Sequence, residues 1–390
     1  MGLLMTVRRT FLTIAFLSFI ELTGCSYLRI QPGLIVGSDD WTMYGGSMGR
    51  TNFSRHALTP PLDRIWEYDA SAGFSPYSAA IADSFLFVGN LQGEIHVINA
   101  ATGKKAGSYD FGSAVIGTPA IDGSSMYVAL SHDGQTLVSY NLASGRIDWE
   151  SKVGDIETSP LLVGNRIFVT SQQGTLVCAG KATGEILWTY SIPSNKRTRL
   201  IHSSPASDGK VVVFGCDNGD LYGVGIDDGK QLWTAHTGGS ILATPSVAAG
   251  RVFAGSLDGS FYAFSVETGK LIWSRPLGAK IFSSQAVSDN SVYVGTAGRN
   301  VFCLDAGTGS VVWEATTGNI VNATPLIAND VVYVGCLDKT LYAYSAHSGE
   351  LLWKYLAEGR IKTMPIAWHQ YLFVLAEDRS VIAFKQVGAQ

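Results

Sequence analysis

Short apolar runs separated by glycine turns recur at a regular interval along this chain. Runs such as Val211–Gly215 and Val331–Gly335 have the β-branched composition of buried strands. Asn218-Gly219 and Asp258-Gly259 follow such runs, and glycine supplies the positive φ that a tight hairpin needs. This pattern predicts repeated hairpins and no helical period.

A hydroxyl–proline step marks each repeat, as at Thr118-Pro119 and Thr244-Pro245, with degenerate copies at Ser78-Ala79, Ser284-Gln285 and Met364-Pro365. The second residues of these steps stand at positions 79, 119, 160, 205, 245, 285, 325 and 365. Self-similarity at a fixed period is the mark of a repeat architecture. The chain therefore contains eight units. We expect the hydroxyls before proline to form local hydrogen bonds with the backbone.

A second glycine turn in most units is followed four residues later by tryptophan, whereas one unit carries Gly107 there. The tryptophans are Trp149, Trp188, Trp233, Trp273, Trp313 and Trp353. Four short strands and two turns in about 40 residues are typical of a propeller blade. We expect an all-β protein, an eight-bladed β-propeller of four-stranded antiparallel blades. The tryptophans are expected to fill the interfaces between blades, where burying a large aromatic is strongly favourable.

The two ends of the repeat are complementary. The last unit stops at residues 384–390 without a fourth strand, and residues 62–68, which include Trp66, have the pattern of that strand alone. We expect residues 62–68 to complete the last blade, because this pairing removes the free sheet edges of an open array.

The start of the chain reads as an export signal. Arg8 and Arg9 precede an apolar run at residues 10–20, which is too short to span a bilayer, and Leu22-Thr23-Gly24-Cys25 resembles a bacterial lipobox. We expect a signal peptide over residues 1–24, lipidation of Cys25, a tether over residues 25–40 and the propeller over residues 41–387. Ser26 in place of aspartate implies the outer membrane, with the propeller in the periplasm.

Charge and composition exclude one class of partner. The formal net charge is −4, and removing residues 1–24 makes it −5, since two arginines and one glutamate are lost. Nucleic-acid binding requires a basic face, so we expect no nucleic-acid partner.

The turn-and-tryptophan pattern, clearest at residues 268–273, resembles the repeat of pyrroloquinoline-quinone (PQQ)-like propellers. Trp41-x-x-Tyr44-Gly45-Gly46 also resembles the start of that superfamily. Length, lipobox and eight units are similar to the propeller lipoproteins of the outer-membrane β-barrel assembly machinery. This resemblance implies a non-catalytic scaffold that binds the central barrel-assembly protein through inter-blade loops.

Two other functions stay open. A generic PQQ-like binding propeller of the envelope is one, because residues 234–243 are short and lack the acidic side chains of the assembly family. A quinone-dependent dehydrogenase is the other, but the chain has no adjacent cysteines and no lid-length connection. For these reasons we expect no PQQ and no Ca²⁺. We expect no catalytic residue, because no Gly-x-Ser-x-Gly elbow or phosphate loop is present, and no metal site, because the seven histidines lack metal-ligand spacing.

The longest inter-blade connection, residues 189–204, is the candidate partner surface, although an ordinary solvated loop is an equal alternative. It holds cationic and aliphatic side chains, a combination typical of interfaces. These residues are Lys196, Arg197, Arg199, Leu200 and Ile201.

Four cysteines lie within the repeats. Their positions place Cys178 beside Cys216, and Cys303 beside Cys336, across consecutive blades. An exported protein permits these two disulfides. Buried free thiols are the alternative, since the paired positions differ in height by about 10 Å at strand rise.

Overall fold

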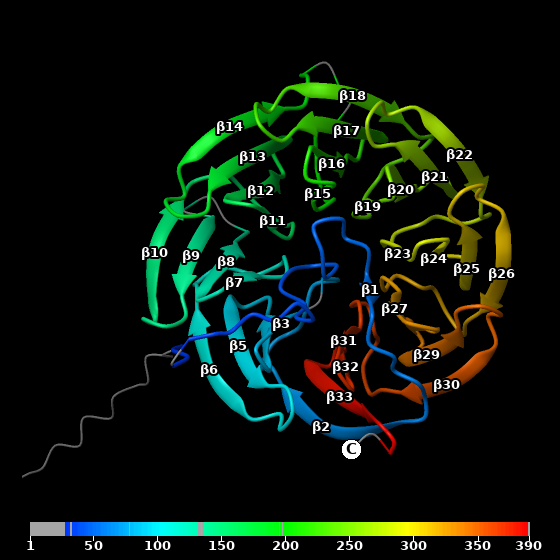
Figure 1. The fold of residues 1–390 in the computed structure, drawn as a ribbon, viewed down its shortest axis with the longest axis horizontal. Coiled ribbons are helices and arrows are strands. Elements are labelled where there is room, and N and C mark those ends of the chain that lie inside the picture. Colours follow the sequence, from blue (N-terminus) through cyan, green and yellow to red (C-terminus); the bar gives the residue numbers. More distant parts are fainter. Residues whose placement is uncertain are drawn as a thin grey trace, which may run out of the picture.

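The computed structural model describes residues 28–31, 33–77, 79–131, 134, 136–194, 196 and 198–388. These residues form eight sheets arranged as blades around a central axis (Figure 1). Each blade has four antiparallel strands, and the seventh also carries β1 (Phe53–Ser54), which pairs in parallel with its innermost strand. The expected all-β, eight-bladed propeller is confirmed. No helix among the described residues has the length and apolar character required to span a bilayer. The predicted signal peptide and Cys25 lie outside them.

The innermost strand of each blade follows the hydroxyl–proline step and is short. These strands are β3 (Ala80–Ala82), β7 (Ala120–Asp122), β11 (Leu161–Val163), β15 (Ala206–Ser207), β19 (Ser246–Ala248), β23 (Ala286–Val287), β27 (Leu326–Ala328) and β31 (Ile366–Trp368). The second strands are the apolar runs of the sequence and are almost completely buried. They are β4 (Phe85–Gly89), β8 (Ser125–Ala129), β12 (Arg166–Ser171), β16 (Val211–Gly215), β20 (Arg251–Gly255), β24 (Ser291–Gly295), β28 (Val331–Gly335) and β32 (Tyr371–Leu375).

The third strands pair with the second across the first glycine turn. They are β5 (Glu94–Asn99), β9 (Leu137–Asn141), β13 (Thr175–Gly180), β17 (Asp220–Gly225), β21 (Ser260–Ser265), β25 (Asn300–Asp305), β29 (Thr340–Ser345) and β33 (Ser380–Gln386). The outer strands carry the tryptophans or their substitutes. They are β6 (Lys105–Asp110), β10 (Arg146–Ser151), β14 (Ile186–Ser191), β18 (Gln231–His236), β22 (Leu271–Pro276), β26 (Val311–Thr316), β30 (Leu351–Leu356) and β2 (Leu62–Asp69).

Closure of the ring follows the prediction. Strand β2 pairs with β33 in antiparallel register from Leu62↔Gln386 to Asp69↔Ser380. Figure 1 shows the blue β2 beside the red β33, so a strand from the first part of the chain and the last strand share blade 8. Residues 62–68 therefore complete the last blade, as expected.

Each docking tryptophan joins its own blade to the next one. A β-bulge precedes it in the outer strand, as between Ile147 and Trp149, and a bulge re-aims the side chain that follows. Trp353 packs against Phe384 of blade 8, and in the other six the indole Nε1 donates to a backbone carbonyl of the next blade, for example Trp273 to Ala306 at 3.1 Å. The ring covers the second glycine turn of that blade, where a Cβ on Gly309 would lie 2.5 Å from Trp273. The same donor geometry is present at Trp66, Trp149, Trp188, Trp233 and Trp313.

Blade 1 has Gly107 in place of tryptophan, and the N-terminal segment fills the resulting interface. Leu28 is fully buried between blades 1 and 2, and Ile30 and Leu34 join the same core. The Tyr140 hydroxyl donates to the Leu28 carbonyl at 2.6 Å. Part of the expected tether over residues 25–40 is therefore packed on the propeller, because burial of these aliphatics replaces the missing indole.

Residues 40–54, here called the axial segment, run along the centre of the ring (Figure 1). Its carbonyls accept hydrogen bonds of 2.7–3.2 Å from inner-strand N–H groups of blades 1, 2, 4, 5, 6 and 7. The fully buried Arg50 reaches blades 3 and 4 by donating to the carbonyls of Ser159, Pro160 and Pro205. Trp368 of blade 8 donates to the Asp40 carboxylate at 2.9 Å. One segment therefore contacts every blade.

The four propeller cysteines are free thiols in buried positions. Cys178 and Cys216 share one inter-blade core, and Cys303 and Cys336 share another. The pairing of faces was predicted correctly, but the two disulfides are not formed. Cys178 lies beside Trp188 in the middle of β13, whereas Cys216 follows the end of β16, so the two side chains enter the core at different heights.

Candidate functional site

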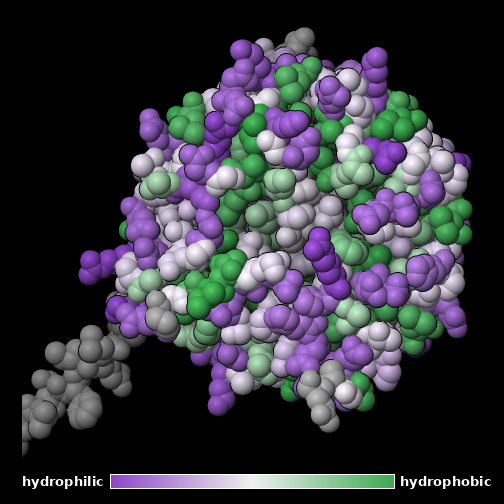
Figure 2. Space-filling view, viewed as in Figure 1, coloured by the Kyte–Doolittle hydropathy of each residue, from purple (hydrophilic) through white to green (hydrophobic). Residues whose placement is uncertain are grey.

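A cavity of about 400 Å³ opens at one end of the propeller axis. Each blade contributes one side chain to the rim of this cavity. The residue stands three positions before the proline of the hydroxyl–proline step, or before the residue that replaces that proline. These eight side chains, the mouth ring, are Pro76, Ile116, Glu157, His202, Leu242, Phe282, Asn322 and Lys362. Because the eight positions are equivalent in the repeat, their side chains surround one opening. Four of these side chains are apolar and four are polar. The view along the axis shows polar side chains mixed with small apolar patches (Figure 2).

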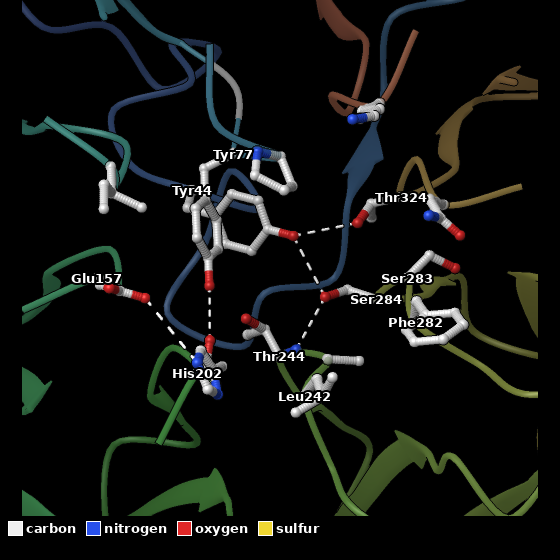
Figure 3. Close-up of a pocket in the computed structure, with 15 residues that line it drawn as sticks. Tyr44, Tyr77, Glu157, His202, Leu242, Thr244, Phe282, Ser283, Ser284 and Thr324 are labelled. Carbon is white, nitrogen blue, oxygen red and sulfur yellow. Dashed lines mark hydrogen bonds and ion pairs between the residues drawn. The ribbon is translucent and has the colours of Figure 1, made fainter. Parts of the chain in front are cut away.

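The floor of the cavity is built from hydroxyl groups. The hydroxyl of Ser159, Ser204, Thr244 and Ser284 each accepts a hydrogen bond from the backbone N–H of the equivalent residue one blade earlier, at 2.9–3.2 Å. We expected these hydroxyls to bond locally, and this expectation is corrected because they link neighbouring blades. Tyr44 of the axial segment points to Ser284 and Thr324 at 3.2 and 3.1 Å (Figure 3).

The polar side of the mouth ring centres on His202. Its Nδ1 lies 3.0 Å from an Asp217 carboxylate oxygen, and its Nε2 lies 3.9 Å from Glu157. The hydrogen bond with Asp217 raises the pKa of His202, burial opposes that rise, and Glu157 adds to it. The Tyr77 hydroxyl donates to the His202 carbonyl at 2.7 Å and fixes the backbone at this point (Figure 3).

The arrangement does not suit a calcium-bound quinone. Calcium takes six to eight oxygen ligands that converge on one point. The mouth ring offers the carboxylate of Glu157 at blade 3 and the amide oxygen of Asn322 at blade 7, which lie on opposite sides of an eight-fold ring. The apolar residues Leu242 and Phe282 stand between them on one side.

The connection between β14 and β15, residues 192–205, is called the blade 3–4 loop here. It is shorter at its start than expected, because Thr189, Tyr190 and Ser191 still pair with β13. Its last residues enter the mouth ring at His202. The loop and the cavity thus belong to the same face of the propeller.

Asp220 binds Lys196 of this loop. Its carboxylate is nearly buried and accepts from Lys196 Nζ at 2.8 Å, from Tyr222 at 3.0 Å and from His236. Burial would raise the pKa of Asp220, but these hydrogen bonds outweigh it and lower the pKa. Lys196 therefore has a structural partner.

The structure describes three of the remaining four predicted contact residues. Arg199 and Leu200 are exposed, with Leu200 at 45%. Ile201 is fully buried in the core between blades 3 and 4, so its prediction as a contact residue is wrong. Arg197 lies outside the described residues.

The repeat register holds the signal that separates Ile201 from its neighbours. In units 2 to 8, the residue directly before the mouth-ring residue is aliphatic. All seven are buried: Val115, Ile156, Ile201, Ile241, Ile281, Val321 and Ile361. The next position forms the mouth ring. Aligning the units at these positions would have identified both the buried isoleucine and the ring.

A family model described as outer membrane protein assembly factor BamB matches residues 56–203, 195–280 and 267–387. Among curated relatives, the BamB of Yersinia pestis is 21% identical over 244 residues, which cover 59% of this chain and 58% of that protein. The BamB of Burkholderia pseudomallei is 31% identical over 107 residues, covering 27% of this chain and 26% of that protein. The alignments thus span less than two thirds of these relatives.

Solved structures share the fold. BamB from Moraxella catarrhalis has a TM-score of 0.71 at 18% identity, covering 83% of this chain and all of that one. Quinohemoprotein alcohol dehydrogenase from Comamonas testosteroni has a TM-score of 0.75 at 15% identity, covering 90% and 81%. At these identities the comparison establishes the propeller and no activity.

Proposed function

This chain belongs to the family of the outer membrane protein assembly factor BamB, and from that premise we propose that it is a non-catalytic scaffold in the assembly of outer-membrane β-barrel proteins. Its partner is the central barrel-assembly protein of the outer membrane. The chain is held at that membrane through lipidated Cys25, with the propeller in the periplasm. It works without a quinone or calcium.

The observation that carries this proposal is the exposed pair Arg199 and Leu200 beside the mouth ring. An arginine next to an exposed aliphatic is typical of interface hot spots. The backbone that presents them is fixed, because the Leu200 carbonyl accepts from Asp217 N at 3.1 Å and from Cys216 Sγ at 3.2 Å. A partner would therefore bind a preorganised surface with little loss of loop entropy.

The test measures binding to the purified periplasmic region of the barrel-assembly protein by biolayer interferometry. The variant is Arg199→Glu with Leu200→Glu, which leaves the backbone hydrogen bonds in place. The control is Lys230→Glu with Leu232→Glu, because both side chains are well exposed near the turn before β18. We expect the first variant to weaken binding by about 30-fold or more, equivalent to about 2 kcal/mol. Equal affinities of wild type and both variants would reject the surface.

A further inference from the structure

Three potential metal ligands from distant parts of the chain meet beside blade 8. They are Asp39, just before the axial segment, His56, between β1 (Phe53–Ser54) and β2, and His369, in the turn between β31 and β32. Their ligand atoms all lie within 4.8 Å of one another. The His56 and His369 rings have centroids 4.9 Å apart.

The backbone around each of these residues is fixed independently. Next to Asp39, the Asp40 carboxylate accepts from the Asp83 N–H at 3.0 Å as well as from Trp368. Two residues before His56, Ser54 pairs with Ala328 of β27. His369 stands in a left-handed conformation with a φ of 49°. The three side chains are thus brought together by the fold itself.

One atom of this cluster has no partner. His56 Nε2 is buried and forms no hydrogen bond within the described part of the chain. The nearest Asp39 oxygen is 3.8 Å away, which is too long for a hydrogen bond. Several other histidine–carboxylate pairs here are hydrogen-bonded, such as His347 with Asp330 at 3.1 Å. A buried polar atom left without a partner calls for an explanation.

We propose that Asp39, His56 and His369 bind a transition-metal dication such as Zn²⁺. Two imidazoles and one carboxylate form a common zinc ligand set, with water at the open position. Calcium and magnesium prefer all-oxygen sites, so the nitrogens favour a transition metal. Ligand atoms about 2.0 to 2.2 Å from zinc in a tetrahedral site lie about 3.3 to 3.6 Å from each other. His56 Nε2 and the Asp39 oxygen, which are 3.8 Å apart, are slightly farther apart than that spacing. The side chains of Asp39 and His369 are exposed and have room to close the remaining distance.

The bound ion would connect three segments that ring closure brings together. It would attach residue 39 and the chain after β1 to the inner hairpin of blade 8. Its role is to stabilise the seam of the propeller and the chain that leads to the axial segment. This role is separate from partner binding at the mouth ring.

The experiment uses the full chain in detergent, without a histidine tag and after removal of metal with EDTA. Zinc chloride is titrated by calorimetry, and cobalt(II) is added in parallel to record ligand-field absorption. We expect one zinc per chain, and a thermal midpoint raised by about 3 °C at a zinc concentration 100 times the dissociation constant.

Three variants remove one ligand each: Asp39→Asn, His56→Ala and His369→Asn. Asparagine tolerates the left-handed backbone at position 369. Each should weaken zinc binding by at least about tenfold, since even outer-shell changes have effects of that size. Asp39→Asn changes an exposed side chain, so it tests the site even if a histidine variant fails to fold. His347→Asn is the control and should bind zinc like the wild type.

Two results would overturn the site. One is a wild-type chain that takes up no stoichiometric zinc. The other is zinc binding that is unchanged in Asp39→Asn and in whichever histidine variants fold.

Discussion

Docking of a tryptophan on the glycine turn of the next blade can be tested at Gly309. Its φ is +69°, and a Cβ added there would lie 2.5 Å from Cε3 of Trp273. Gly250 is a matched position, because its φ is +74° and a Cβ would meet nothing within 4 Å. Substitution by alanine imposes the same backbone strain at both sites and adds the clash only at Gly309.

The expected magnitudes follow from these contacts. A left-handed alanine costs about 1–2 kcal/mol, so Gly250→Ala should destabilise the propeller by that amount. At Gly309 the indole must also move by about 1 Å to reach normal carbon contact. That shift disturbs a buried ring whose Nε1 donates to Ala306. Overpacking of this kind costs about 1–3 kcal/mol more.

The assay is urea unfolding followed by circular dichroism. A double-mutant cycle with Trp273→Leu isolates the contact, because Gly309→Ala should then cost no more than Gly250→Ala. If Gly309→Ala destabilises the wild type and the Trp273→Leu background equally, the indole is not what the glycine accommodates, and the docking account fails.

Three further predictions concern the rest of the molecule. Arg50→Ala should lower the free energy of unfolding by about 4 kcal/mol, since it leaves several buried carbonyls without a donor. Substitution of the exposed Arg64 by alanine should lower it by under about 1 kcal/mol. Equal unfolding midpoints of the two variants would contradict the role of the axial segment. Burial opposes ionisation of Glu94, but hydrogen bonds from His96, Ser71 and Asn90 lower its pKa to about 2. The stability advantage of wild type over Glu94→Gln should therefore be full above about pH 4.5 and decline as the pH falls towards 2, and a pH-independent difference in unfolding free energy would disprove this. Burial raises the pKa of three of the four propeller cysteines to about 11, so Ellman's reagent should react slowly with the folded chain at pH 8. After unfolding without reductant, the same reagent should count four thiols, apart from Cys25.

The eight-bladed fold was predictable because each of its determinants is local or periodic. Glycine turns, β-branched runs and the tryptophan repeat each specify one part of a blade. Counting these units determines the ring. Residues 62–68 could be assigned to the last blade because that blade lacks its fourth strand and this segment has a strand pattern without a blade of its own. Pairing the two leaves no free sheet edge.

The candidate site was predicted less completely. The sequence pointed to the blade 3–4 loop by its length, and Arg199 and Leu200 are indeed exposed there. Composition alone could not distinguish Leu200 from the buried Ile201. That distinction depends on the register within the repeat, which determines whether a side chain faces the neighbouring blade or the axis.

The sequence alone determined the blade, the number of blades and the way the ring closes, since these follow from turns and periodicity within a single repeat unit. Only the tertiary structure decided where the non-repeating residues lie. Leu28 fills the interface that lacks a tryptophan, Arg50 bonds carbonyls of blades 3 and 4, and Asp39 meets His56 and His369. No periodic pattern encodes these contacts, because they join single residues that are far apart in the chain and come together only when the ring has closed.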